Sequence, residues 1–216
     1  MQKHEIIILI PCFNEESTIL KICNEANKFA QVLVLDDAST DNSKKILKKN
    51  KINFISNVEN QGYEKNLIKG FKHIFNNLKE KKYIITLDGD GELKTNNISK
   101  LIDFMRNEKM DLVIGKREKF NRFSENLLNL IFFIKYGIYD PVSGLKLYKI
   151  EYLNKIIEKL SNKMFLVDAV CLFKKEKFKV SNIHIEVKKR KDKSRVGNNF
   201  TSNLKMLRII LRSILY

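Results

Sequence analysis

The chain has 216 residues, 44% of them hydrophobic, which suits one α/β domain with a packed core. Its formal net charge is +16, an excess that attracts polyanions such as nucleic acid, anionic lipid or phosphorylated substrates, although a general bias toward Lys, Asn and Ile would also produce it. No apolar stretch approaches the roughly 20 residues of a membrane span, and the three scattered cysteines follow no disulfide or zinc spacing, so we expect a soluble or peripheral protein in a reducing compartment.

Short apolar runs alternate with helical patterns along the first half of the chain. Residues 5–10 form a continuous β-rich run that suits a strand buried on both faces, and Pro11 is expected to end it. Residues 17–30 carry apolar side chains every three or four positions, which predicts a helix. The same patterns predict strands at 31–35, 52–56, 82–87 and 111–114, and helices at 43–50, 62–78 and 98–107. This alternation predicts a mostly parallel α/β sheet flanked by helices.

The second half of the chain is less regular. Residues 127–134 are apolar on nearly every side, residues 151–160 predict a helix, and residues 178–187 predict a strand that a dense basic loop follows. Residues 201–216 mix apolar side chains with lysine and arginine, which is typical of an amphipathic helix at a membrane surface. We therefore expect one domain over residues 1–200 and a basic C-terminal amphipathic helix over residues 201–216.

Polar clusters follow three of the expected strands, at the sheet edge where open α/β proteins bind ligands. They are residues 11–16 (PCFNEE), 36–41 (DDASTD) and 88–92 (DGDGE). One such cluster is explained by helix capping, which uses the same residue types. Three acidic clusters at strand ends are harder to explain in that way, because crowded carboxylates repel one another unless a cation or a donor relieves them.

Asp88 and Asp90 are the sharpest feature of these clusters. They stand on alternate positions with the flexible Gly89 between them, so both carboxylates can converge on one hard divalent cation. Mg²⁺ or Mn²⁺ held by so few protein carboxylates completes its coordination from substrate phosphates. A solvated turn is the alternative interpretation, but the pair directly follows a buried strand, which favours a metal site.

Together these motifs resemble glycosyltransferase family 2, which has the Rossmann-like GT-A fold. Within that family the chain is most similar to the dolichol- or polyprenyl-phosphate hexose synthases, because it carries a D-x-x-S-G block and a late basic block. The matching stretches keep the family's order over nearly the whole chain: IPCFNEE (10–16), VLDDASTDNS (34–43), NQGYEKNLIKGF (60–71), LDGDGE (87–92), DPVSGLKLYK (140–149) and RKDKSR (190–195).

The resemblance implies roles for matching positions. Residues that bind the nucleotide sugar or the acceptor would be Pro11, Asn14, Glu15, Asp37, Ser39, Glu92, Lys193 and Arg195. Catalytic residues would be Asp88, Asp90, Arg117, Asp140 and Arg190, of which Asp88 and Asp90 would hold Mg²⁺ or Mn²⁺. The resemblance also implies inversion at the anomeric carbon of the sugar.

The residues themselves point to the chemistry of two sites. Asp37 follows a strand directly, so its carboxylate is expected to accept hydrogen bonds from a nucleoside base or ribose. Arg190, with its basic neighbours, is expected to hold phosphate groups, a solvated loop being the alternative. A hydroxyl acceptor would need a carboxylate base, for which Asp140 and Asp168 are the candidates, whereas a lipid phosphate is already anionic and needs none.

Other functions are weighed against this one. A family 2 transferase acting on a saccharide hydroxyl is the alternative enzyme, and a degenerate scaffold is disfavoured by the intact pair of carboxylates. A nucleic-acid-binding module is disfavoured because the aromatic residues lie within apolar runs. We expect a nucleotide-sugar donor, a lipid-phosphate or glycan acceptor and an anionic membrane surface as partners, with the protein peripheral at the cytoplasmic face. The donor sugar, its base and the oligomeric state are not specified by the sequence.

Overall fold

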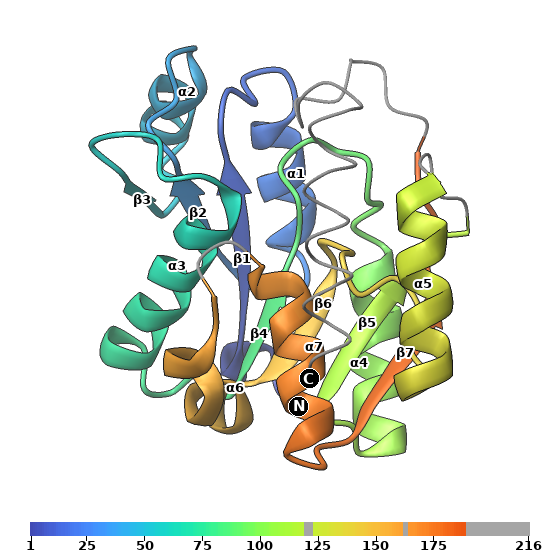
Figure 1. Cartoon of the computed structure of the whole chain (residues 1–216). Coiled ribbons are helices and arrows are strands. Elements are labelled where there is room, and N and C mark those ends of the chain that lie inside the picture. The colour runs from blue at the N-terminus through green and yellow to red at the C-terminus, as the bar shows by residue number, and fades with distance from the viewer. Residues whose placement is uncertain (119–122, 162–163, 189–216) are drawn as a thin grey trace.

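The computed structural model describes residues 1–118, 123–161 and 164–188. Within these residues seven strands form one sheet in the order β3-β2-β1-β4-β6-β5-β7, with helices on both faces (Figure 1). The strands are β1 (Ile6–Cys12), β2 (Gln31–Asp36), β3 (Phe54–Ser56), β4 (Tyr83–Thr86), β5 (Leu112–Lys116), β6 (Lys146–Lys149) and β7 (Val180–His184). All pairings are parallel except those of β6, which runs antiparallel to both β4 and β5. The predicted mostly parallel sheet is therefore confirmed.

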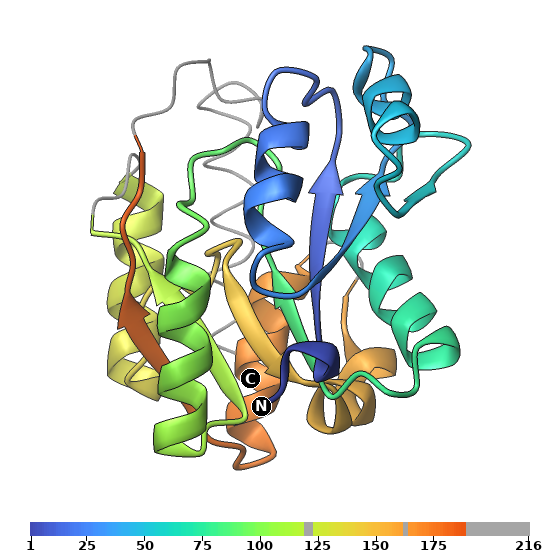
Figure 2. The ribbon, with the colours of Figure 1, turned by 180° about the vertical axis from the view of Figure 1, so that it is seen from behind.

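Two hydrophobic cores lie on the two faces of the sheet. The helices are α1 (Ile19–Ala26), α2 (Ser43–Lys49), α3 (Tyr63–Asn77), α4 (Asn97–Glu108), α5 (Phe123–Tyr136), α6 (Ile150–Ile156) and α7 (Phe165–Lys175), with 3-10 turns at Lys3–Glu5 and Ile157–Lys159. Helices α3, α5, α6 and α7 cover one face, and α1, α2 and α4 cover the other, as the view from behind shows (Figure 2). Strand β1 is buried along its whole length, with alternate residues entering the two cores.

Pro11 does not end the first strand, which is a correction to the sequence-based expectation. Strand β1 continues to Cys12, and Pro11 pairs with Leu35 of β2. The carbonyl group of Leu9 faces β4, so the backbone nitrogen of Pro11 faces the same side. The pairing of β1 with β4 ends at Leu9 and Thr86, before Pro11. A backbone N–H at position 11 would therefore have no partner in β4, and proline costs the sheet no hydrogen bond there.

Two buried elements were not predicted. Helix α7 is buried at every position from Phe165 to Phe173, so its sequence shows no polar face and no helical period. Strand β6 is short and has lysine at both ends, which hides it from a search for apolar runs. Helix α5 contains the apolar stretch 127–134, and among the described residues no helix is long and apolar enough to cross a membrane. The expected helix at 201–216 lies outside the described residues.

The topology brings one set of loops to one edge of the sheet. The carboxyl ends of β1, β2, β4 and β5 meet at this edge because these strands point the same way: β1 is parallel to β2 and β4, and β4 and β5 are both antiparallel to β6. The antiparallel β6 delivers its first residue, Lys146, to the same edge, so the loop that precedes it lies there too. Figure 1 shows this edge at the top for β1 and β2.

Candidate active site

The loops after β1 and β2 are tied together by hydrogen bonds of predicted site residues. Asn14 adopts a left-handed conformation, with φ of 57°, and its Oδ1 accepts a bond from the backbone N–H of Thr40 at 2.8 Å. The Oγ of Ser39 accepts from the backbone N–H of Asn14 at 3.0 Å, and the N–H of Glu15 donates to Ser43 Oγ at 2.9 Å. The structure therefore brings Asn14, Glu15 and Ser39 together, next to Pro11 at the end of β1.

Asp37 holds the loop between β3 and α3. Asp37 is buried, with 3% of its surface exposed. Its Oδ1 accepts hydrogen bonds from Asn57 Nδ2 at 2.7 Å and from the backbone N–H of Gln61 at 2.8 Å. Its Oδ2 accepts from the N–H of Gly62 at 2.8 Å. Asn57 and Gln61 in turn line a cavity of about 650 Å³, together with lysines of α3. Asp37 thus shapes one wall of this cavity, and its direct contact with a nucleoside stays a prediction.

Asp88 follows β4 and is fixed by contacts from two distant parts of the chain. Its Oδ1 accepts a hydrogen bond from the hydroxyl of Tyr63, at the start of α3, at 2.7 Å. Gly144, in the loop before β6, packs directly against the carboxylate, since a Cβ atom at that position would lie 1.9 Å from Asp88 Oδ2. Burial, followed by the charge of Asp88, raises the pKa of Tyr63, so the phenol remains a hydrogen-bond donor.

The turn after Asp88 packs closely on β1. A Cβ atom at Gly89 would lie 2.9 Å from the carbonyl oxygen of Pro11, and Gly91 has φ of +77°, which favours glycine. Thr18 Oγ1 donates to the carbonyl of Gly89 at 2.7 Å. These contacts determine where the Asp90 side chain, two residues after Asp88, is presented.

The electrostatics of this pair fit a cation-binding role. Burial, and next the negative charge of Asp90, raise the pKa of Asp88 to about 6. Asp90 Oδ1 accepts from the N–H of Glu92 at 3.0 Å. Among the described residues no group of three or more His, Cys, Asp or Glu side chains is arranged to hold a metal. Two crowded carboxylates of this kind suit Mg²⁺ or Mn²⁺ bound together with a diphosphate.

Arg117 and Asp140 form a bidentate ion pair at the ends of β5 and of the loop before β6. The distances are 2.8 Å from Arg117 Nε to Asp140 Oδ2 and 2.9 Å from Nη2 to Oδ1, and the backbone N–H of Arg117 also donates to Oδ2. Asp140 is fully buried, and its own N–H donates to Asn129 Oδ1 at 2.7 Å. Burial alone lowers the pKa of Arg117, but the bonds to Asp140 more than offset this and raise it above its ordinary value. Arg117 is therefore held as a cation.

The two candidate bases differ in their surroundings. Both carboxylate oxygens of Asp140 are engaged by Arg117, so a role as base would require that pair to open. Asp168 is buried in α7, where its Oδ2 accepts from the N–H of Ser161 at 3.1 Å. The three predicted phosphate-binding residues of the late basic block, Arg190, Lys193 and Arg195, lie outside the described residues.

Several residues of the site were not singled out from the sequence. Three of them lie within stretches that match the family motifs: Tyr63, Gly144 and Lys146. None is an acid, a histidine or a cysteine, the residue types that usually indicate a catalytic or metal-binding role. Their role appears only once β6 and the start of α3 are placed beside the end of β4. Thr18 was missed for the same reason, because its partner Gly89 is 71 positions away.

We predict that Asp88→Asn stabilises the metal-free protein at high pH. The pKa of Asp88, about 6 in the folded protein, lies above its ordinary value of 3.8, so the folded state binds more protons than the unfolded state between these values. This group therefore costs stability as pH rises from about 4 to about 6, and the cost persists above pH 6. Removing the charge should raise the melting temperature at pH 8 by a few degrees, and have no such effect at pH 4. Thermal melts in EDTA at both pH values check this, and an equal shift at both would contradict it.

Comparisons with known proteins identify relatives of this chain. The sequence profile of Glycosyl transferase family 2 matches residues 7–181. Uncharacterized protein MJ0544 of Methanocaldococcus jannaschii is 40% identical over 120 residues, so the match spans about half the length of that relative and 52% of this chain. The UDP-N-acetylglucosamine--dolichyl-phosphate N-acetylglucosaminyltransferase of Methanococcus voltae is 25% identical over 84% of each chain.

A solved structure shares the fold. The glucosyl-3-phosphoglycerate synthase of Mycobacterium tuberculosis, in complex with Mn²⁺, uridine-diphosphate-glucose and phosphoglyceric acid, superposes with a TM-score of 0.72. The alignment covers 96% of this chain and 80% of that one, at 14% sequence identity. This likeness confirms the expected GT-A fold.

Proposed function

Because this chain belongs to glycosyl transferase family 2, we propose that it is an inverting hexosyltransferase that moves a sugar from a UDP- or GDP-sugar to a polyprenyl or dolichyl phosphate. The observation that carries the proposal is that one loop, residues 140–145, contacts both the carboxylate of Asp88 and the cation of Arg117. A pair of carboxylates suited to a divalent cation and a permanently charged guanidinium thus lie at one site. The relative from Methanococcus voltae, whose name specifies a dolichyl-phosphate acceptor, supports the lipid-phosphate branch.

Asp88 and Asp90 would hold Mg²⁺ or Mn²⁺, which when bound supplies electrostatic stabilisation to the departing diphosphate. The fit rests on their crowding: burial first and then the charge of Asp90 raise the pKa of Asp88, and a cation would relieve the repulsion between the two carboxylates. Tyr63 fixes the orientation of Asp88 by its hydrogen bond, so this carboxylate need not reorganise when the donor binds. The neighbouring structure with Mn²⁺ and a UDP-sugar supports a divalent metal for this fold.

Arg117 would bind phosphate oxygens, and Asp140 would orient it. Arginine presents a planar fork of donors that matches the geometry of phosphate oxygens, and Asp140 fixes the orientation of this fork with two bonds, while Glu125 Oε2 lies 3.8 Å from Nη2. The same pair favours a phosphate acceptor over a hydroxyl. A hydroxyl acceptor needs a base, but both oxygens of Asp140 already accept bonds from Arg117, whereas a phosphate attacks as an anion without one. Transfer to a saccharide hydroxyl is the second candidate, and its base would be Asp168 or an Asp140 released from Arg117.

The basic block at 190–195 would add further phosphate contacts. The last described residue, Lys188, donates its backbone N–H to the carbonyl of Glu92 at 2.8 Å, next to the Asp88–Asp90 turn. This placement supports the proposed contacts of Arg190, Lys193 and Arg195 with donor or acceptor phosphates.

The donor can be tested by thermal stability. A ligand that binds only the folded protein stabilises it by RT ln(1 + [L]/Kd), about 2.7 kcal/mol at a hundredfold excess over Kd. We expect at least one UDP- or GDP-sugar with Mn²⁺ to raise the melting temperature, and the same nucleotide sugar with EDTA to do so much less. If no nucleotide sugar shifts the melting temperature in the presence of Mn²⁺ or Mg²⁺, the proposed donor class is wrong.

A membrane surface would bring the lipid acceptor to the site, and α5 offers a face for it. Leu128 and Phe132 pack into the core, whereas Leu130 and Ile134, on the other side of the helix, are 54% and 75% exposed. Exposed apolar side chains at this spacing form one stripe along the helix. Together with the expected amphipathic helix at 201–216, this stripe supports peripheral attachment at the cytoplasmic face of a membrane.

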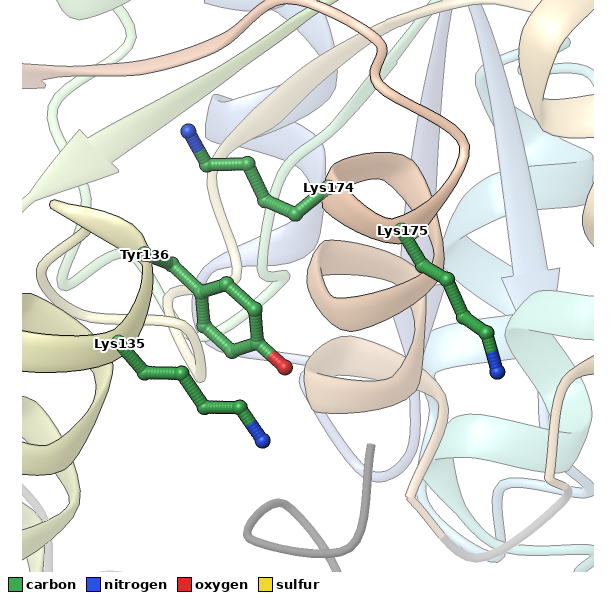
Figure 3. A pocket seen from close by; sticks show the side chains of 4 residues that line it. All are labelled: Lys135, Tyr136, Lys174 and Lys175. Carbon is green, nitrogen blue, oxygen red and sulfur yellow. The ribbon is translucent and has the colours of Figure 1, made fainter.

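A basic cavity lies beside the end of this stripe. It has a volume of about 320 Å³ and is lined by Lys135, Tyr136, Lys174 and Lys175, at the ends of α5 and α7 (Figure 3). Apolar side chains next to lysines are the composition expected of a surface that rests on anionic lipid. Each lysine near such a surface contributes about 1 kcal/mol of attraction, which salt screens.

We predict that the full-length protein floats with anionic vesicles at low salt, and that Leu130→Gln with Ile134→Gln weakens this binding at least about tenfold. Burying a side chain of this size in lipid contributes roughly 1.5–3 kcal/mol. The loss of two such contributions exceeds the about 1.4 kcal/mol that corresponds to a tenfold change in binding. Val58→Gln is the matched control, since Val58 is a fully exposed apolar residue on another part of the surface. Truncation after Ser202 should also weaken flotation. If the wild-type protein does not float with anionic vesicles at low salt, the proposal of membrane attachment is wrong, and a soluble saccharide acceptor is favoured.

A further inference from the structure

Lys146, the first residue of β6, is a buried lysine for which the proposed chemistry gives no direct role. It has no exposed surface, and its Nζ donates to the carbonyl oxygens of Pro141 and Ser143, each at 2.8 Å. Burial lowers the pKa of Lys146 to about 7, while the negative charges of Asp140 and Asp88 act in the opposite direction. A lysine is rarely buried to this degree unless specific bonds hold its ammonium group.

The two carbonyl groups belong to the loop that contacts the site at two points. At one point Asp140 holds the guanidinium of Arg117 with two bonds. At the other, Gly144 lies against the carboxylate of Asp88, with no room for a side chain between them. The bonds of Lys146 reach the residues between these two contacts, so they fix the segment that links them.

We infer that Lys146 is a positioning residue, which holds the loop before β6 so that Arg117 and Asp88 keep the geometry that transfer requires. The inference rests on the proposed glycosyl transfer at this site. Because Lys146 acts through the loop, its loss should affect the stabilisation of charge in the transition state more than the binding of the nucleoside. A misplacement of about 1 Å in such groups can lower turnover about a hundredfold.

The test is Lys146→Met, which keeps the length of the side chain and removes its charge and its donors. We expect kcat to fall at least about tenfold while KM for the donor changes less than about threefold, the pattern of an interaction needed in the transition state. Lys149→Met is the matched control at the other end of the same strand, where Lys149 pairs with Asp111 at 2.8 Å, remote from the site. It should leave both constants within about twofold of wild type.

Folding of each variant is established by near-UV circular dichroism and thermal melting. A folded Lys146→Met protein with wild-type kcat overturns the inference, and so does a change in KM alone. If the methionine variant does not fold, Lys146→Gln, which retains one donor group, replaces it with the same expected fall in kcat and the same contradicting result.

A second readout separates this inference from the proposed function. If the wild-type protein transfers no sugar, the proposed function fails, and amide hydrogen exchange in the loop 140–145 then tests the inference by itself. We expect faster exchange in this loop in Lys146→Met than in wild type or Lys149→Met, because two of its carbonyl groups lose their partner. Unchanged exchange overturns the inference.

Discussion

Asp90→Ala is expected to abolish sugar transfer while leaving the protein folded. Asp90 is half-buried at the end of the turn after β4, and its Oδ1 accepts a local hydrogen bond from the N–H of Glu92 at 3.0 Å. Truncating this half-buried side chain leaves the core intact, but it would remove the principal ligand of the proposed divalent cation, which would stabilise the leaving diphosphate. We expect a fall in kcat/KM of at least about a thousandfold, which corresponds to about 4 kcal/mol of transition-state stabilisation.

The measurement is initial-rate kinetics with saturating Mn²⁺, alongside the binding of Mn²⁺ in the presence of the nucleoside diphosphate. Asp103→Ala is a suitable control, because Asp103 is an exposed acid on α4, away from the site. It should leave kcat and metal binding unchanged. Wild-type turnover by a folded Asp90→Ala protein would contradict the proposed metal-binding role of Asp90.

Gly144→Ala should be nearly as damaging, although it adds only one methyl group. An alanine Cβ at this position would lie 1.9 Å from Asp88 Oδ2 and 2.3 Å from Asp88 Cγ, so either the carboxylate or the loop must move. Asp88 cannot move freely, because the hydroxyl of Tyr63 holds its other oxygen. The loop cannot move without disturbing Asp140 and hence Arg117. A shift of about 1 Å in these groups predicts a fall in kcat of about a hundredfold.

Gly70→Ala provides the steric control for this variant. Its added methyl group would also meet a close neighbour, since the Cβ would lie 2.4 Å from Leu35 Cδ1, but that neighbour is the flexible end of a core side chain. We expect kcat of the folded Gly70→Ala protein to stay within about twofold of wild type. A Gly144→Ala protein that is folded and as active as Gly70→Ala would show that contact with Asp88 does not govern the reaction.

The elements that were predicted well are those whose burial is visible as a local pattern. Strand β1 is buried on both faces and is a continuous apolar run, and α3 presents apolar residues at helical spacing. Helix α7 was not predicted because it is buried on all sides, and a helix without a polar face shows no helical period in its sequence. Strand β6 was not predicted because it begins with Lys146, and lysine normally indicates a surface position. In the structure this lysine is fully buried, and its ammonium group donates to two carbonyl groups.

The site was predictable as far as its residues are neighbours in the sequence. Asp88 and Asp90 were found because their spacing alone suggests a shared cation. The pairing of Arg117 with Asp140 was not foreseen, although both residues were named, because it depends on the antiparallel β6 bringing its preceding loop beside the end of β5. The contact between Gly144 and Asp88 depends on the same strand, which no alternation of strands and helices predicts.

The central claim, transfer to a lipid phosphate, is tested most directly by comparing two acceptors that differ only in the phosphate. Wild-type protein, Mn²⁺ and the nucleotide sugar that binds best are incubated with a polyprenyl phosphate or with the polyprenol of the same length, and products are identified by mass spectrometry. A phosphate needs no base, and Asp140 is engaged by Arg117, so we predict a hexosyl-phospholipid from the first acceptor and no product from the second. Transfer to the alcohol or to a saccharide, with none to the phosphate, would contradict the account.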